Sequence, residues 1–104
     1  MALVKLFKFT DDQSARMMGV SLRTFRKWTS VSYLGIHASE MVIRLSELYE
    51  IGIDTFGSSQ SFISWLNSSS ISLGDKKPVQ LIESGMGVEY IKDELMRMKY
   101  GMPS

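Results

Sequence analysis

Apolar residues recur with the period of an α-helix along most of the chain. From Glu40 to about Thr55 the spacing predicts one continuous helix, whose inward-facing residues are Met41, Leu45, Leu48 and Tyr49. Gly52 lies inside this helix, where glycine costs about 1 kcal/mol relative to alanine, and Gly57 is expected to end it. The pattern therefore predicts a long helix in the middle of the chain.

Two short helices are predicted ahead of the long one. Thr10 and Gln13 have the spacing of a capping box, so the first helix begins there and ends at Gly19. Ser21 can cap a second helix over residues 22–29, whose buried side would consist of Leu22, Phe25 and Trp28.

This pair of helices has the spacing of a helix-turn-helix. Ala15 allows the two helices to approach closely, and Gly19 permits the sharp turn between them. The outer face of the second helix would carry Arg23, Arg26 and Lys27, which suit phosphates or guanine edges in a major groove. An αα-hairpin that packs without touching DNA fits the same pattern, so both interpretations stay open here.

Shorter helices are predicted in the C-terminal half, over residues 59–66, 79–83 and 88–99. The buried stripe of the last helix would consist of Val88, Ile91, Leu95 and Met98. Gly85 and Gly87 are expected to break the chain before it, and loops are predicted over residues 29–39 and 67–77. Only residues 3–9 show some alternation typical of a strand. The chain is therefore predicted to be all-α.

Residue types that support catalysis or metal binding are scarce. The sequence has no cysteine, which excludes disulfides and thiolate metal sites. Its one histidine, His37, lies in a predicted loop without a carboxylate at metal-ligand or catalytic spacing. We therefore expect no enzyme activity, no metal, no cofactor and no small-molecule substrate.

No apolar run approaches the roughly 18 residues that a membrane span needs. Lys5 and Lys8 interrupt the N-terminal apolar stretch, which does not fit a signal peptide. These features favour a soluble cytoplasmic protein that does not contact a membrane.

Positive charge gathers near the predicted helix-turn-helix, although the net charge is only +1. Residues 1–50 hold seven Lys/Arg and five Asp/Glu, whereas residues 51–104 hold five and six. No acidic residue occurs between Asp12 and Glu40, while four basic residues do. Such a basic face is compatible with phosphate contact, and a solvated helix face would have the same composition.

The C-terminal half carries an ordered set of residues that resembles a known family. These residues are Phe56-Gly57, Trp65-Leu66, Leu73-Gly74, Pro78, Leu81-Ile82, Gly87, Leu95 and Tyr100-Gly101. Their order and spacing are similar to the toxin-binding domain of the Xre/MbcA/ParS-type antitoxins. Ser39-Glu40 followed by Ile43-Arg44-Leu45 resembles the connecting helix of this family, and the Gly19-Val20-Ser21 turn with Thr24 resembles its helix-turn-helix.

The resemblance implies a type II antitoxin that inhibits a RES-domain toxin, a class of NAD-degrading enzymes similar to ADP-ribosyltransferases. The C-terminal tail would obstruct the active site of the toxin. The corresponding toxin-binding residues here are Arg97, Lys99, Tyr100, Gly101, Met102, Pro103 and Ser104. Operator DNA would contact Ser21, Arg23, Thr24, Arg26 and Lys27, and the protein, as a homodimer or as a toxin complex, would repress its own operon.

The resemblance also divides the chain into two parts. Residues 1–53 would form the helix-turn-helix region with its connecting helix, and residues 54–104 the toxin-binding domain. Two features depart from the family pattern, since only ten residues precede the first helix of the helix-turn-helix and Ser68 stands where a proline is expected. The alternative function is a stand-alone helix-turn-helix regulator whose C-terminal half only dimerises.

Overall fold

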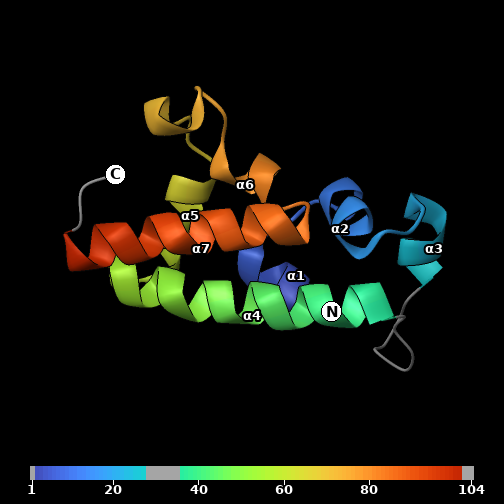
Figure 1. Ribbon diagram of the computed structural model, residues 1–104. Helices are drawn as coiled ribbons and strands as arrows, with labels where there is room; N and C mark the ends of the chain where they lie inside the picture. Colours follow the sequence, from blue (N-terminus) through green and yellow to red (C-terminus); the bar gives the residue numbers. More distant parts are fainter. Residues whose placement is uncertain (1, 28–35, 102–104) are drawn as a thin grey trace.

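The computed structural model describes residues 2–27 and 36–101. The chain forms the helices α1 (Ala2–Phe7), α2 (Asp11–Met18), α3 (Leu22–Lys27), α4 (Ile36–Phe56), α5 (Ser59–Leu66), α6 (Pro78–Leu81) and α7 (Gly85–Tyr100), with a 3-10 helix η1 (Ile71–Leu73) between α5 and α6 (Figure 1). No strand occurs in these described ranges, so the all-α prediction is confirmed.

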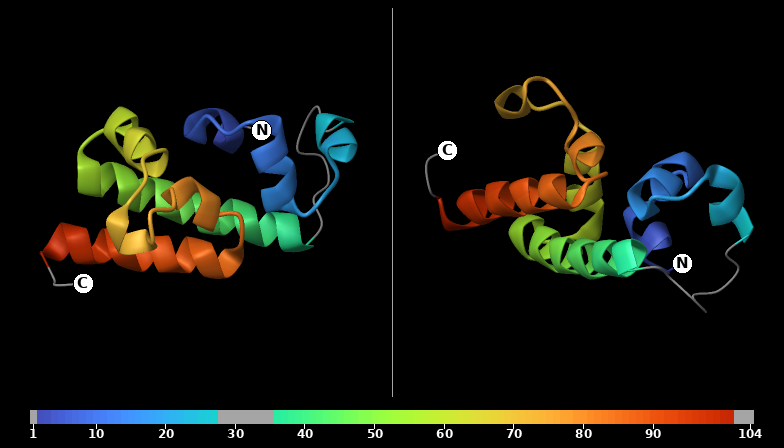
Figure 2. Two further views of the ribbon diagram at one scale, coloured as in Figure 1. Left: turned by 90° about the horizontal axis from the view of Figure 1, so that it is seen from above. Right: turned by 45° about the vertical axis from the view of Figure 1, so that its right-hand side comes forward.

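The two longest helices, α4 and α7, lie side by side along the long axis of the molecule (Figures 1 and 2). Three polar contacts join them, each between residues 45 positions apart in the chain: Arg44 to Glu89, Glu47 to Lys92, and Asp54 to Lys99. Because every residue advances a helix by about 1.5 Å, a constant offset means that the two helices run in the same direction. We call these contacts the α4–α7 ladder.

One hydrophobic core connects both halves of the chain. Phe7 of α1 packs edge-on against Tyr49 and Phe62, with ring centroids 5.2 and 6.0 Å apart. The same core contains Met17 of α2 and the fully buried residues Leu45, Leu48, Leu66, Ile82, Ile91 and Leu95. The domain boundary predicted between residues 53 and 54 falls inside α4 and stays a prediction.

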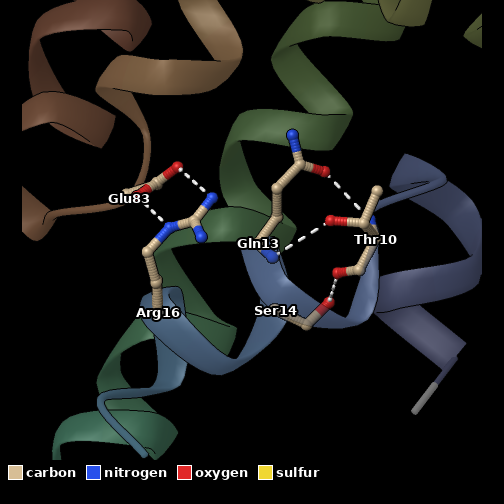
Figure 3. Close-up of polar contacts among 5 residues, drawn as sticks. All are labelled: Thr10, Gln13, Ser14, Arg16 and Glu83. Atoms are coloured by element: carbon tan, nitrogen blue, oxygen red, sulfur yellow. Dashed lines mark hydrogen bonds and ion pairs between the residues drawn. The ribbon is translucent and has the colours of Figure 1, made fainter. Parts of the chain in front are cut away.

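The capping signals predicted for α2 and α3 are confirmed. Thr10 Oγ1 accepts a hydrogen bond from the Gln13 N–H at 3.1 Å, and Gln13 Oε1 accepts one from the Thr10 N–H at 2.9 Å (Figure 3). Gly19 ends α2 with φ at +73°, a left-handed conformation that favours glycine. Ser21 Oγ accepts the Thr24 N–H at 3.1 Å and so opens α3. The two helices are therefore joined by the short turn that the sequence predicts.

The structure corrects several boundaries in the first half. Residues 2–7 form α1 instead of a strand-like segment, so a helix does precede α2. The predicted second helix is described only as far as Lys27, and Trp28 lies outside the described residues. α4 begins at Ile36 rather than near Glu40, because the buried Ala38 extends its inward face by a turn.

The start of α7 is also corrected. Gly85 and Gly87 belong to its first turn and do not break the chain, and Ser84 Oγ caps the helix by accepting the Gly87 N–H at 3.0 Å. A Cβ at Gly87 would lie only 1.6 Å from the backbone oxygen of Leu81. The close approach of α6 to α7 therefore requires glycine at this position. Part of the predicted loop over residues 67–77 forms η1.

A bidentate ion pair connects α2 to the segment between α6 and α7. Arg16 Nε and Nη2 lie 2.8 and 3.2 Å from the two carboxylate oxygens of Glu83 (Figure 3). The hydrogen bond with Glu83, together with its negative charge, raises the pKa of Arg16. The pair is partly exposed, so its stabilising effect is modest, but its fork geometry orients the N-terminal helices relative to α7.

Candidate functional site

α7 ends at the tip of the molecule that lies farthest from α3 (Figure 1). Tyr100 is 62% exposed there. Met98 is 44% exposed, contrary to the predicted buried stripe, because the buried face of α7 ends at Leu95. Met96, also exposed, lies one turn before Tyr100 on the same side of α7, whereas Met98 lies on the other side; we call the exposed pair Met96 and Tyr100 the tip surface.

The two cations predicted to bind a toxin are both paired within the chain. Arg97 Nη1 lies 3.2 Å from the carboxylate of Glu94, whose residue is only 9% exposed. Lys99 Nζ contacts the carboxylate of Asp54 on α4, and this hydrogen bond raises the pKa of Lys99. The ammonium of Lys99 also lies 5.4 Å from the ring centroid of Tyr100. Arg97 therefore compensates a buried carboxylate, whereas Lys99 belongs to an exposed pair whose partner can be exchanged.

The structure thus brings Arg97, Lys99, Tyr100 and Gly101 together at the end of α7. Gly101 ends the helix with φ at +66°. The other three residues of the predicted toxin-binding set, Met102, Pro103 and Ser104, lie outside the described residues. Within the described part of this set, Tyr100 and Lys99 are the side chains most available to a partner.

The residues predicted to contact DNA differ in how they are engaged. Ser21 and Thr24 hydrogen-bond each other at the start of α3, with Ser21 Oγ donating to Thr24 Oγ1 at 3.0 Å. Arg26 forms an exposed ion pair with an aspartate of α2 at 3.4 Å. Arg23 and Lys27 are exposed and form no ion pair with any other residue that the structure describes. These two side chains therefore supply the uncompensated positive charge of α3.

Most residues of the C-terminal motif hold the domain together. Those with buried side chains are Leu66, Leu73, Pro78, Ile82 and Leu95. Gly57 and Gly74 occupy left-handed positions after α4 and η1. The motif is therefore largely a signature of the fold, and Tyr100 is its most exposed aromatic member.

A groove that the sequence pattern does not reveal lies between the first halves of α4 and α7. It has a volume of about 590 Å³, and its lining includes Glu40, Met41, Arg44, Met86, Tyr90 and Asp93. His37, expected in a loop, lies in the first turn of α4 and also borders the groove. No local pattern could have located this groove, because residues about 45 positions apart form its two sides.

The described parts of the chain, residues 2–27 and 36–101, also bear on membrane spans and metal sites. No helix there is both long and apolar enough to cross a membrane. No three His, Asp or Glu side chains in these ranges gather as a metal ion would require. Every buried side-chain nitrogen or oxygen in the same ranges has a hydrogen-bond partner.

Comparison with known proteins bears on the C-terminal half. Residues 52–101 match the family model of the antitoxin Xre/MbcA/ParS C-terminal toxin-binding domain. The match extends from the last turn of α4 to Gly101, and therefore includes the whole of α7 and the tip surface. The comparison with curated proteins found no match to this chain.

Proposed function

Because residues 52–101 form a C-terminal toxin-binding domain of the Xre/MbcA/ParS antitoxin type, we propose that the protein neutralises a RES-domain toxin. In this proposal the end of α7 and the tail after it cover the NAD-degrading active site of the toxin. The observation that carries the proposal is the exposed tip surface, which lies inside the matched domain. The family match favours toxin binding over the alternative of a stand-alone regulator whose C-terminal half only dimerises.

The side chains at the end of α7 differ in how well they can contact the toxin. Tyr100 offers a large, exposed aromatic side chain, the kind of residue that contributes most to protein interfaces. Lys99 can leave the exposed Asp54 and meet an acidic group on the toxin. Arg97 is less suited, because moving it would leave the buried Glu94 carboxylate without its cation. We therefore assign the inhibitory contact to residues 99–104.

Removal of residues 99–104 tests this contact. Cells that produce the proposed RES-domain toxin should stop growing with the truncated protein and grow with the full chain. In the full chain, Tyr100→Ala should weaken the purified complex about tenfold or more, because loss of an aromatic anchor costs about 2 kcal/mol. Isothermal titration calorimetry measures this change.

The truncation also removes the ion pair between Lys99 and Asp54, so a control must separate the two effects. Asp54→Asn breaks the same pair and keeps the tail, and this variant should still protect cells. A truncated protein that folds and still protects would place the inhibitory contact elsewhere. Failure of the full chain to bind the toxin would reject the RES-domain assignment itself.

We propose DNA binding as a second function, carried by the uncompensated Arg23 and Lys27 on α3. α3 lies at the opposite end of the molecule from the tip surface, so toxin and DNA would occupy different surfaces (Figure 1). As a homodimer or as a toxin complex, the protein would use this helix to repress its own operon.

Replacing both cations with glutamine tests DNA binding. Each phosphate contact contributes about 0.9 to the slope of log K against log salt, so the double variant should lower that slope by about 1.8. The matched control neutralises Lys76 and Lys77, which lie just before α6. Equal salt dependence of the two double variants would show that α3 does not contact phosphates.

A further inference from the structure

The α4–α7 ladder stops before the two helices do. Glu40 lies one turn before Arg44 on α4, and Gly85 lies one turn before Glu89 on α7. The offset of 45 residues therefore places Glu40 opposite Gly85, the first residue of α7. Glycine has no side chain, so this position of α7 offers no counterpart to the carboxylate. Glu40 is exposed and forms no ion pair within the described ranges. The first rung of the ladder is therefore incomplete.

The groove opens where that rung is missing. The buried Met41 contributes to its floor, and Met86 and Tyr90, which are 88% and 48% exposed, contribute to one wall. A Cβ at Gly85 would lie 3.4 Å from Arg44 Nε, so the absent side chain leaves space beside the guanidinium. The groove can therefore accept both a polar and an apolar side chain from outside.

The charges that line the groove favour a positively charged side chain as the polar group that enters it. The guanidinium of Arg44 is already compensated by Glu89 at 2.7 Å. Asp93 also lines the groove and, like Glu40, forms no ion pair with another described residue. Two carboxylates thus remain uncompensated beside two exposed apolar side chains. A partner segment with a basic residue next to an apolar one would satisfy both features.

We propose that this groove is a second docking surface for the toxin. A lysine or arginine of the toxin takes the place beside Gly85 and completes the ladder on Glu40. A second basic residue of the toxin pairs with Asp93, which lies about 12 Å further along α7. A neighbouring apolar side chain of the toxin packs against Met86 and Tyr90. The proposal rests on the proposed function, because that function identifies the toxin as the partner.

The groove and the tip surface belong to the same helix. Met86 and Tyr100 are about 21 Å apart along α7 at 1.5 Å per residue, so a single protein can cover both. Tip contacts block the toxin's active site, whereas groove contacts hold the toxin in register along α7. Groove variants therefore change affinity and its salt dependence.

The test measures the affinity of the purified full-length antitoxin for the purified RES-domain toxin. The double variant Glu40→Gln/Asp93→Asn should bind about five- to tenfold more weakly at low salt, because it loses two partly exposed ion pairs. At about 0.5 M salt, where such pairs are screened, the difference should largely disappear. Tyr90→Ala should weaken binding at both salt concentrations, because the contact that it removes is apolar.

Two further variants test whether the loss of affinity is specific to the groove. Glu50→Gln removes an exposed charge of α4 outside the groove and should leave the affinity unchanged. Gly85→Lys supplies the missing cation from α7 itself and fills the groove, so it should weaken toxin binding by a similar factor. The thermal midpoint of each variant shows that the fold is retained.

The outcomes separate this proposal from the one that it rests on. If the wild-type protein binds the toxin and the groove variants bind equally well, the groove inference is overturned and the proposed function stands. If the groove variants instead change the oligomeric state of the antitoxin alone, the groove is a contact between copies and the inference is overturned. If the wild-type protein does not bind the toxin, the proposed function fails.

Discussion

Gly52 lies in α4 where the ring of Phe62 from α5 covers the helix backbone. A Cβ at this position would lie 2.4–2.5 Å from three atoms of that ring. Such distances are far below van der Waals contact, and Phe62 is fully buried and cannot move aside easily. This contact explains why glycine stands at position 52, although helix propensity disfavours glycine there.

We expect Gly52→Ala to destabilise the protein by about 1–2 kcal/mol, because overpacking costs more than the helix propensity gained. Denaturation in urea measures the change. Gly85→Ala is the matched control, since its Cβ would meet only the flexible Arg44 side chain, and it should be neutral or slightly stabilising. Equal effects of the two substitutions would mean that α4 and α5 pack less closely than described.

Lys99 and Asp54 form a pair whose response to pH follows from the direction of the pKa shift. The pKa of Lys99 is raised above its ordinary 10.5 by the Asp54 hydrogen bond, so the stability it contributes is complete below that value and lost only above it. Asp54→Asn should therefore change the thermal midpoint by the same small amount at about pH 6 and about pH 9. An effect that grows between these values would indicate that another group controls the pair.

At the scale of the elements, the capping box of α2 was visible in the sequence because it involves residues only three positions apart. Its backbone and side-chain bonds fix where the helix begins (Figure 3). Ser14 adds a bond from its hydroxyl to the Thr10 carbonyl oxygen at 2.9 Å. Local spacing was sufficient here because every partner lies within one turn.

Thr10→Ala should lower the free energy of unfolding by about 1 kcal/mol, the usual effect of losing an N-cap. Gln13→Ala should lower the free energy of unfolding less in the Thr10→Ala variant than in the wild-type protein, because the two residues form one capping box. Ser46→Ala serves as the control, since its hydroxyl only bonds a carbonyl one turn back within α4, and it should have little effect. Full additivity of the first two substitutions would indicate that the bonds are independent.

The predicted starts of α4 and α7 were wrong because they depend on residues far apart in the sequence. Ala38 extends α4 because it finds a buried contact in the tertiary structure, which its own segment does not indicate. Gly85 and Gly87 stay helical because Ser84 caps them and α6 lies against the backbone. Propensity predicts a break at glycine, and tertiary packing overrides that preference.

At the scale of the whole molecule, one core, one bidentate ion pair and part of the α4–α7 ladder join the two predicted parts of the chain. Phe7 and Met17 pack into the core that α4, α5 and α7 form. Arg16 and Glu83 connect α2 to the start of α7 outside that core. The α2–α3 unit and the tip surface are thereby held at opposite ends of a body 42 Å long.

Reversing one charge of the ion pair tests its role. Glu83→Arg should destabilise the protein by a small but measurable amount, because two guanidinium groups would face each other where a partly exposed ion pair stood. The double variant Arg16→Glu/Glu83→Arg should recover most of that loss in urea denaturation. A double variant as unstable as the single one would show that the pair contributes no specific interaction.

The sequence by itself determined the helical class, most helix positions, the caps of α2 and α3, and the order of the motif in the C-terminal half. These features depend on the helical period and on partners a few residues apart, which a single chain displays directly. The motif also led to the antitoxin family, which the match over residues 52–101 confirmed.

Only the tertiary structure decided which side chains remain available for binding. Arg97 looked like a contact residue, but its charge compensates the buried Glu94, and Ser21 and Thr24 bond each other. The groove beside Gly85 exists because α7 lies parallel to α4 at a fixed offset. Packing between distant segments sets burial, charge pairing and open space, and no local pattern along the chain contains that information.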